Sequence, residues 1–184
     1  EDYLELDLTY NRGDLLSLRG VAYEVAAITD SPLKFLALTP QDLIWTGQNL
    51  PQTPVRIEDY ELSPVQCIAK IEGLKVAPSP KDWVRKLEDS GIRAVNNLVD
   101  ITNLCMVEYG QPFHAFDAKD IKDETIIVRC AKKEEEITTL DNKHRRLTPQ
   151  DIVLVDTKGP VDVGGIMGGK GTEVKDSTTT ILLS

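Results

Sequence analysis

The sequence predicts an α+β fold in which mostly antiparallel sheets carry helices on one side. Helical periodicity of apolar residues is confined to roughly the first 110 residues. After residue 115 the chain consists of short runs rich in β-branched residues, separated by turn residues and by one stretch dense in glycine. Strands that follow a pair of helices in this order are typical of an antiparallel sheet with a helical layer.

Size and composition fit one medium domain, or a small module and one domain. The chain has 184 residues, of which 41% are hydrophobic and 28% charged, as in ordinary soluble globular proteins. Its net charge of −9 argues against a free-standing nucleic-acid binder, since such proteins gain affinity by neutralising phosphates. The three scattered cysteines predict neither a zinc site nor a disulfide framework. Their scatter and odd number fit a reducing, cytoplasmic setting. No apolar run is long enough to span a bilayer, so we expect no membrane contact.

The N-terminal residues predict a strand followed by a helix. Tyr3–Tyr10 alternates apolar and polar residues, and a turn at 11–14 then provides Asp14 as the N-cap of a helix that runs to Val25. A buried stripe is expected at Leu15, Leu18, Val21, Ala22 and Val25. The predicted domains are a structural module at 1–30, a connector at 31–63 and a main domain at 64–184. Within the connector we expect a helical turn after Pro40 and an extended piece over Val55–Tyr60.

Two helices are predicted in the middle of the chain, after a strand at Val65–Ile71. The first has Ser79 as N-cap and Pro80 as its first residue, and it ends at Gly91. The second carries an apolar face and ends at Gly110, and its apolar face comprises Val95, Leu98, Val99, Thr102 and Met106. Beside that face run Asn96, Asp100 and Asn103, with His114 shortly after the helix end. These polar residues and His114 fit either a solvated helix face with a core histidine or the wall of a polar pocket.

The remaining sequence predicts strands and tight turns. After a capped turn at 117–120, strands are expected at Thr125–Cys130, Ile137–Leu140, Arg145–Leu147, Ile152–Val155 and Thr178–Leu183, with His144 on the surface. The stretch 163–169 holds four glycines but matches neither a phosphate loop nor a dinucleotide fingerprint. Its glycines fit either close strand packing or a loop whose bare backbone shapes an amino-acid pocket.

Several motifs in the same order resemble one known family. VDITN followed by GQPFHAFD, and later GGIMGG followed by DSTTTILL, are similar to the editing module of the beta chain of bacterial phenylalanyl-tRNA synthetase. The upstream segment LDLTYNRGDLLSLRGVAYEVAA resembles that chain's N-terminal module. The resemblance implies a β-sandwich with a helical layer, an editing domain that is incomplete at its C-terminal end, and part of the N-terminal module.

The resemblance also implies a function and a set of site residues. The family's editing module hydrolyses tyrosine wrongly attached to tRNA(Phe), and no activated nucleophile is evident here, so we expect a positioned water. Thr102, Asn103 and His114 match catalytic positions, with His114 as a base or, as we favour, a contact to the terminal ribose. Arg93, Gly165, Gly168 and Ser184 match substrate-binding positions. Ser184 stands where the family has the glutamate that recognises the tyrosine hydroxyl.

Partners and cofactors follow from the same resemblance. They would be the 3′ end of tRNA(Phe) carrying tyrosine, and an alpha chain with which the full protein forms a heterotetramer. ATP and Mg²⁺ would serve the full synthetase, and no cofactor is expected in this fragment. A different class of function stays open, because a non-catalytic structural or tRNA-docking domain can have the same fold.

Overall fold

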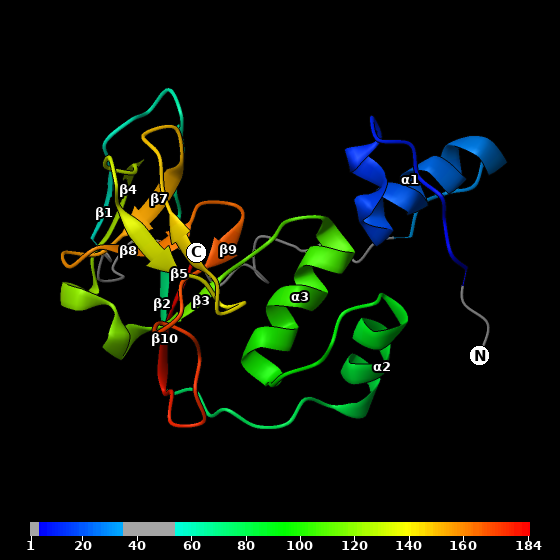
Figure 1. Ribbon diagram of the computed structural model, residues 1–184. Helices are drawn as coiled ribbons and strands as arrows, with labels where there is room; N and C mark the ends of the chain where they lie inside the picture. Colours follow the sequence, from blue (N-terminus) through cyan, green and yellow to red (C-terminus); the bar gives the residue numbers. More distant parts are fainter. Residues whose placement is uncertain (1–3, 35–53) are drawn as a thin grey trace, which may run out of the picture. The chain divides into compact units, whose positions relative to one another are not determined.

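The computed structural model describes residues 4–34 and 54–184, which form two compact units (Figure 1). One unit consists of Cys105–Gln111 with the described residues that precede Gln52. The other consists of the described residues of Thr53–Leu104 and Pro112–Ser184. The helical turn predicted after Pro40 lies outside the described residues, and the domain boundaries at 30 and 63 stay a prediction. No helix in the described ranges has the length and apolar character needed to cross a membrane.

The N-terminal segment differs from the predicted strand and helix. Residues 4–9 form no strand, because no second strand pairs with them among the described residues. A 3₁₀ turn, η1 (Gly13–Leu16), precedes helix α1 (Leu18–Thr29), which ends at Asp30 in the left-handed conformation. None of the residues of α1 is buried, so the buried stripe expected on this helix is also absent. Sequence periodicity fixes which residues share a face but not whether that face is covered.

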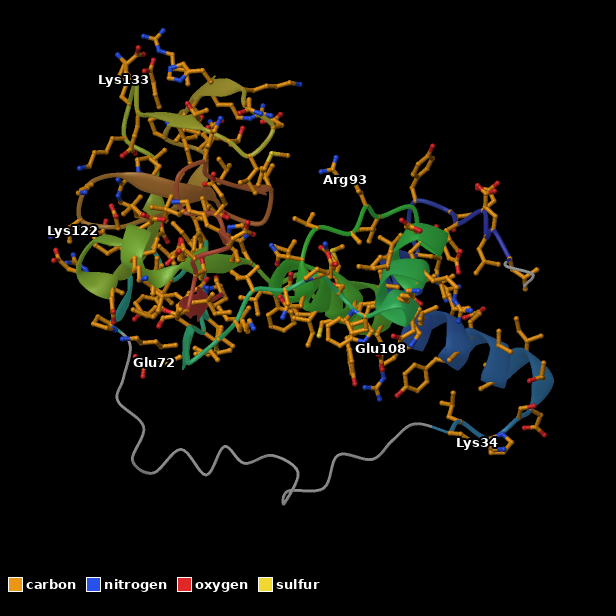
Figure 2. All side chains as sticks on the ribbon, turned by 90° about the horizontal axis from the view of Figure 1, so that it is seen from below. Lys34, Glu72, Arg93, Glu108, Lys122 and Lys133 are labelled. Atoms are coloured by element: carbon orange, nitrogen blue, oxygen red, sulfur yellow. The ribbon has the colours of Figure 1, made fainter. Side chains whose placement is uncertain are left out.

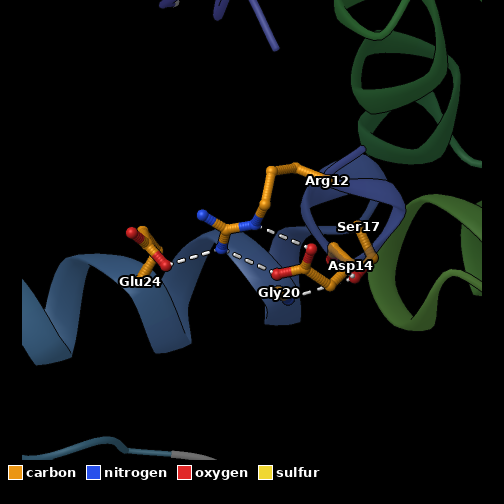
Figure 3. A network of polar contacts seen from close by, with 5 residues as sticks. All are labelled: Arg12, Asp14, Ser17, Gly20 and Glu24. Carbon is orange, nitrogen blue, oxygen red and sulfur yellow. Dashed lines mark hydrogen bonds and ion pairs between the residues drawn. The ribbon is translucent and has the colours of Figure 1, made fainter. Parts of the chain in front are cut away.

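Ser17, and not Asp14, is the N-cap of α1 (Figure 3). The Ser17 hydroxyl accepts a hydrogen bond of 3.0 Å from the N–H of Gly20. Asp14 instead receives two hydrogen bonds from the Arg12 guanidinium, at 3.0 and 2.8 Å, and Arg12 also reaches Glu24 at 2.7 Å. These contacts lower the pKa of both carboxylic acids below their ordinary values. The prediction of Asp14 as the N-cap is therefore wrong.

The second unit contains three sheets, which are antiparallel except for one parallel pair. The five-stranded sheet has the order β1-β4-β7-β8-β9, and its parallel pair is β1 with β4. Its strands are β1 (Val55–Ile57), β4 (Ile126–Cys130), β7 (Ile152–Val155), β8 (Pro160–Val163) and β9 (Met167–Gly168). The three-stranded sheet has the order β2-β10-β3, with β2 (Ala69–Glu72), β10 (Thr180–Leu183) and β3 (Ala115–Asp117). The hairpin is β5 (Glu136–Thr138) with β6 (His144–Arg146).

The predicted strands are thus largely confirmed, and the two larger sheets pack face to face. Their common core joins Phe116 and Leu182 of the small sheet to Ile126, Val128 and Leu154 of the large one. A second apolar cluster fills the space between the large sheet and the hairpin, and it includes Ile137, Val153 and Val163. This arrangement confirms the α+β class and the sandwich-like sheets. The strand expected at Val65–Ile71 is shorter at its start, since β2 begins at Ala69.

Helix α3 (Asn97–Tyr109) packs on the outer face of the small sheet. Helix α2 (Lys81–Asp89) lies beside α3 in Figure 1. Leu98 of α3 packs with Ala115 and Ile181, which lie on the face of β3 and β10 opposite to Phe116 and Leu182. Gly91 and Gly110 adopt positive φ after these helices, as expected of helix ends.

The polar residues near the start of α3 hold the preceding segment in place. Asn96 accepts hydrogen bonds from the N–H groups of Leu98 and Val99 and so caps the helix. Asp100 is fully buried and accepts from the Val95 N–H at 2.8 Å and from the Ser79 hydroxyl. Ser79 is therefore not the cap of α2, contrary to the prediction. Two members of the predicted polar stripe, Asn96 and Asp100, therefore have a structural role, and Asp100 is closed off from water.

Candidate functional site

His114 lies where the chain enters β3, at the end of the small sheet. Its backbone exchanges two hydrogen bonds of 2.9 Å with Ser184, which extends the pairing of β3 and β10 by one residue each. Side chains alternate along a strand, so His114 and Phe116 both point into the sandwich. Their rings meet edge to face, with centroids 4.5 Å apart. The sheet register therefore fixes the direction of the imidazole.

Gly168 provides the space that the imidazole of His114 occupies. A Cβ atom on Gly168 would lie 2.4 Å from Cε1 and 2.5 Å from Nε2 of His114, which is closer than atoms can pack. A side chain at position 168 would thus collide with the ring. The structure joins two residues that the sequence analysis placed in one site, although they are far apart in the chain. The contact shows that Gly168 packs closely against the ring, and the interpretation of the glycine stretch as the wall of an amino-acid pocket stays a prediction.

The Nε2 atom of His114 is buried and has no hydrogen-bond partner among the described residues. Burial alone lowers the pKa of His114 from its ordinary value of 6.5, because a charged ring would lose its hydration. The ring is therefore neutral at pH 7 and can donate or accept one hydrogen bond at Nε2. An unpartnered buried nitrogen costs free energy unless a bound molecule supplies the missing partner.

Ser184 and Gln66 extend the polar group around His114. Because Ser184 lies directly opposite His114 in the register, both side chains lie on the same face of the small sheet. The Gln66 amide donates a hydrogen bond of 2.7 Å to Oγ of Ser184. We call His114, Gly168, Ser184 and Gln66 the imidazole cluster. It combines a hydroxyl, an amide and a neutral ring at one end of the sandwich.

Asp162 on β8 is a further polar residue at this site, and the sequence analysis missed it. It lies directly opposite Gly168 in the pairing of β8 with β9, and only 6% of it is exposed. Residues directly opposite one another carry their side chains on the same face, so Asp162 points to the side on which His114 lies. A charged residue between Val161 and Val163 in an otherwise apolar strand is the sequence signal that could have revealed it.

Burial raises the pKa of Asp162 to about 6, and no hydrogen bond or positive charge opposes this shift. We expect Asp162→Asn to raise the free energy of unfolding at pH 7 by about 1 to 3 kcal/mol. As pH rises from the ordinary value of 3.8 to about 6, the unfolded chain releases a proton that the folded chain retains, so the parent chain loses stability in this window. Urea unfolding of both chains at about pH 3.5 and pH 7 measures the effect. A variant less stable than the parent at pH 7 would contradict an uncompensated buried carboxylate.

The other predicted site residues are not bonded to the imidazole cluster in the described structure. Thr102 is buried and donates its hydroxyl to the carbonyl of Val99 at 2.7 Å, within α3. Asn103 follows it and is partly exposed. Arg93 is exposed before α3, and its side chain points outward in Figure 2. Gly165 occupies the exposed turn between β8 and β9 with φ of +70°, where glycine is favoured.

The described side chains of this site can bind and orient a ligand. No serine or cysteine bonds to the His114 ring in the described residues, which disfavours a covalent intermediate. The same residues contain no group of three or more His, Cys, Asp or Glu side chains arranged to hold a metal ion. What the site offers is a neutral donor or acceptor, a buried acid and bare backbone, in apolar surroundings. Such a set suits an uncharged polar group on a largely apolar ligand.

Comparisons with known proteins point to one family. The family model described as B3/4 domain matches residues 62–184. The chain is 46% identical over 184 residues to the phenylalanine–tRNA ligase beta subunit of Carboxydothermus hydrogenoformans, and this match covers 100% of the chain and 23% of that subunit. It is 42% identical over 186 residues to the corresponding subunit of Lactobacillus johnsonii, covering 100% of the chain and 22% of that subunit. The chain thus spans less than a quarter of the length of these relatives.

A solved structure supports the fold. It is a crystal structure of an N-terminal fragment of the phenylalanyl-tRNA synthetase beta subunit from Pyrococcus horikoshii, with a TM-score of 0.54 and 17% sequence identity. The similarity covers 94% of this chain and 52% of that one. At this identity the likeness concerns the arrangement of helices and sheets and not the site.

Proposed function

Because this chain belongs to the B3/4 domain family, we propose that it forms the part of a phenylalanine–tRNA ligase beta subunit that hydrolyses tyrosine wrongly attached to tRNA(Phe). The observation that carries the proposal is the unpartnered, buried Nε2 of His114 beside Gly168. A substrate atom that bonds to this nitrogen relieves the cost of leaving it unpaired, so the site gains affinity for a ligand with a hydroxyl or carbonyl group.

His114 acts in this proposal as a substrate contact and not as the general base. An aminoacyl ester is already reactive, so a bound water in the correct place is enough for hydrolysis at a useful rate. The lowered pKa of His114 makes its ring a weaker base than an exposed histidine, while its neutral form still donates or accepts a hydrogen bond. Thr102 and Asn103 on α3 are proposed to orient the water or the substrate amine. Backbone N–H groups near Gly165 and Gly168 are proposed to bind the developing oxyanion.

The rest of the enzyme supplies what this chain lacks. With a net charge of −9, the chain is unsuited to attract tRNA by itself. We therefore propose that the other parts of the beta subunit and a partner alpha subunit bind the tRNA and deliver its 3′ end. Aminoacylation with ATP and Mg²⁺ would take place outside this chain, in the cytoplasm.

We expect His114→Ala to reduce kcat/KM for Tyr-tRNA(Phe) hydrolysis by about 10- to 100-fold, because it removes a hydrogen bond in a buried site. Asn103→Ala is expected to reduce it by about 10-fold. The measurement uses the intact ligase, with both subunits and tRNA(Phe) charged with tyrosine.

His144→Ala is the matched control, because His144 is exposed on the β5–β6 hairpin and contacts Glu136 and the Thr138 hydroxyl there. It should leave the rate unchanged. If His114→Ala and Asn103→Ala also hydrolyse the ester at the parent rate, neither residue belongs to the site. That result would favour the second function open to this fold, a domain that docks tRNA without catalysis.

A further inference from the structure

The loop between β5 and β6, residues 139–143, is hydrogen-bonded to the strand that carries Gly168, and we call it the hairpin loop. The Leu140 N–H donates a hydrogen bond of 3.0 Å to the Gly168 carbonyl. Thr139 forms an antiparallel bridge with Gly169. These contacts join the hairpin to the glycine stretch at the point where the His114 ring packs.

Leu140 of the hairpin loop also meets the His114 ring. One methyl group of Leu140 lies 3.2 Å from the position that Cβ would have on Gly168. Cε1 and Nε2 of His114 lie 2.4 and 2.5 Å from that same position. The backbone of Gly168 and the side chain of Leu140 thus bound the ring together, and the path of the hairpin loop decides where both of them lie.

Arg145 of β6 holds the hairpin loop through two of its side chains. Its Nε donates a hydrogen bond of 2.9 Å to Oγ1 of Thr139, and its Nη2 donates one of 2.8 Å to Asp141. The Thr139 hydroxyl donates to Asp141 at 2.5 Å, so the three side chains form a closed ring of hydrogen bonds. The bond from Thr139 and the charge of Arg145 lower the pKa of Asp141, which is therefore ionised at pH 7. Thr139 is fully buried, so the loss of a partner there is costly.

We propose that Arg145 is a positioning residue of this site: through Thr139 and Asp141 it fixes the hairpin loop, which in turn holds Gly168 and Leu140 against the His114 ring. The inference rests on the proposed hydrolysis of Tyr-tRNA(Phe), and it adds to the site a residue that acts through others.

The register of the hairpin places Arg145 on the side of the glycine stretch. Arg145 lies directly opposite Ile137, so the two side chains share one face of the hairpin. Cδ1 of Ile137 lies 3.1 Å from the position that Cβ would have on Gly169, so this face is the one that meets the glycine stretch. Arg146 is the next residue and points to the other face, where it pairs with Glu134. Arg146 therefore provides a matched control of the same residue type.

The test measures hydrolysis of Tyr-tRNA(Phe) by the intact ligase. We expect Arg145→Ala to lower kcat/KM by about 10-fold, because the hairpin loop loses the side chain that orders it. In a His114→Ala background the same substitution should change kcat/KM by no more than about 2-fold, since the ring that the loop positions is then absent. Arg145→Lys restores a positive charge beside Asp141 and should recover part of the loss. Arg146→Ala should leave the rate within about 2-fold of the parent rate.

The possible results separate the inference from the proposed function. If the parent ligase leaves Tyr-tRNA(Phe) intact, the editing function is wrong and the inference falls with it. If the parent hydrolyses the ester and Arg145→Ala does so equally fast, only the role of Arg145 is wrong. Equal losses in the parent and His114→Ala backgrounds would also overturn the inference, because Arg145 would then support the fold and not the placement of the ring. Should Arg145→Ala fold poorly, Arg145→Lys is compared in the same two backgrounds.

Discussion

Asp100→Ala is expected to lower the free energy of unfolding of this chain by about 3 kcal/mol. Asp100 is fully buried in α3, where its carboxylate accepts from the Val95 N–H at 2.8 Å and from the Ser79 hydroxyl. Hydrogen bonds to a charged acceptor contribute more than neutral ones, and alanine would remove the side-chain acceptor of both the Val95 N–H and the Ser79 hydroxyl. Urea denaturation followed by circular dichroism measures the change.

Two further variants provide losses of stability with which that of Asp100→Ala can be compared. Asp100→Asn keeps one oxygen that can accept from Val95, so it should cost only about 1 kcal/mol. Glu108→Ala removes an exposed acid from the same helix and should change stability by less than about 0.5 kcal/mol. Equal losses for all three variants would show that the buried contacts of Asp100 contribute nothing specific.

Asp100 also shows which structural features sequence periodicity can predict and which it cannot. The spacing of apolar residues predicts α3 and its end at Gly110, because those signals are local. It is wrong for Val95, which precedes the helix and is exposed. The hydrogen bonds of Asp100 cannot be predicted from local sequence, since they depend on the path of the segment that contains Ser79 and Val95. A polar stripe on a helix has the same pattern whether it faces water, a ligand or a neighbouring loop. The choice between these three needed the structure.

The residues of the candidate site show the same difference between local and non-local signals. The family resemblance placed His114 and Gly168 in one site, and the structure brings them into contact. Asp162 escaped notice because its significance depends on the register of β8 with β9, which pairs it with Gly168. The prediction of an N-terminal strand was wrong for a related reason. Alternation of apolar and polar residues indicates a strand only if another strand pairs with it, and the described residues offer none.

Gly168→Ala is expected to lower the free energy of unfolding by about 2 to 3 kcal/mol and to reduce Tyr-tRNA(Phe) hydrolysis by at least about 10-fold. The new methyl group would lie 2.4 Å from the His114 ring. The ring cannot move easily, because it packs on Phe116. In addition, the backbone N–H and C=O of His114 are both hydrogen-bonded to Ser184. Either the ring or strand β9 must shift, and both changes disturb the imidazole cluster.

A double-mutant cycle assigns the penalty to the ring itself. In the His114→Ala background the obstacle is absent, so adding Gly168→Ala should cost close to nothing and can fill part of the space that the imidazole leaves. Gly159→Ala is the control, because a Cβ on Gly159 would meet no atom within 4 Å. If Gly168→Ala costs the same in both backgrounds, the penalty arises from the backbone of β9. The absence of a side chain at position 168 would then have nothing to do with the histidine, and the site would lose its main structural support.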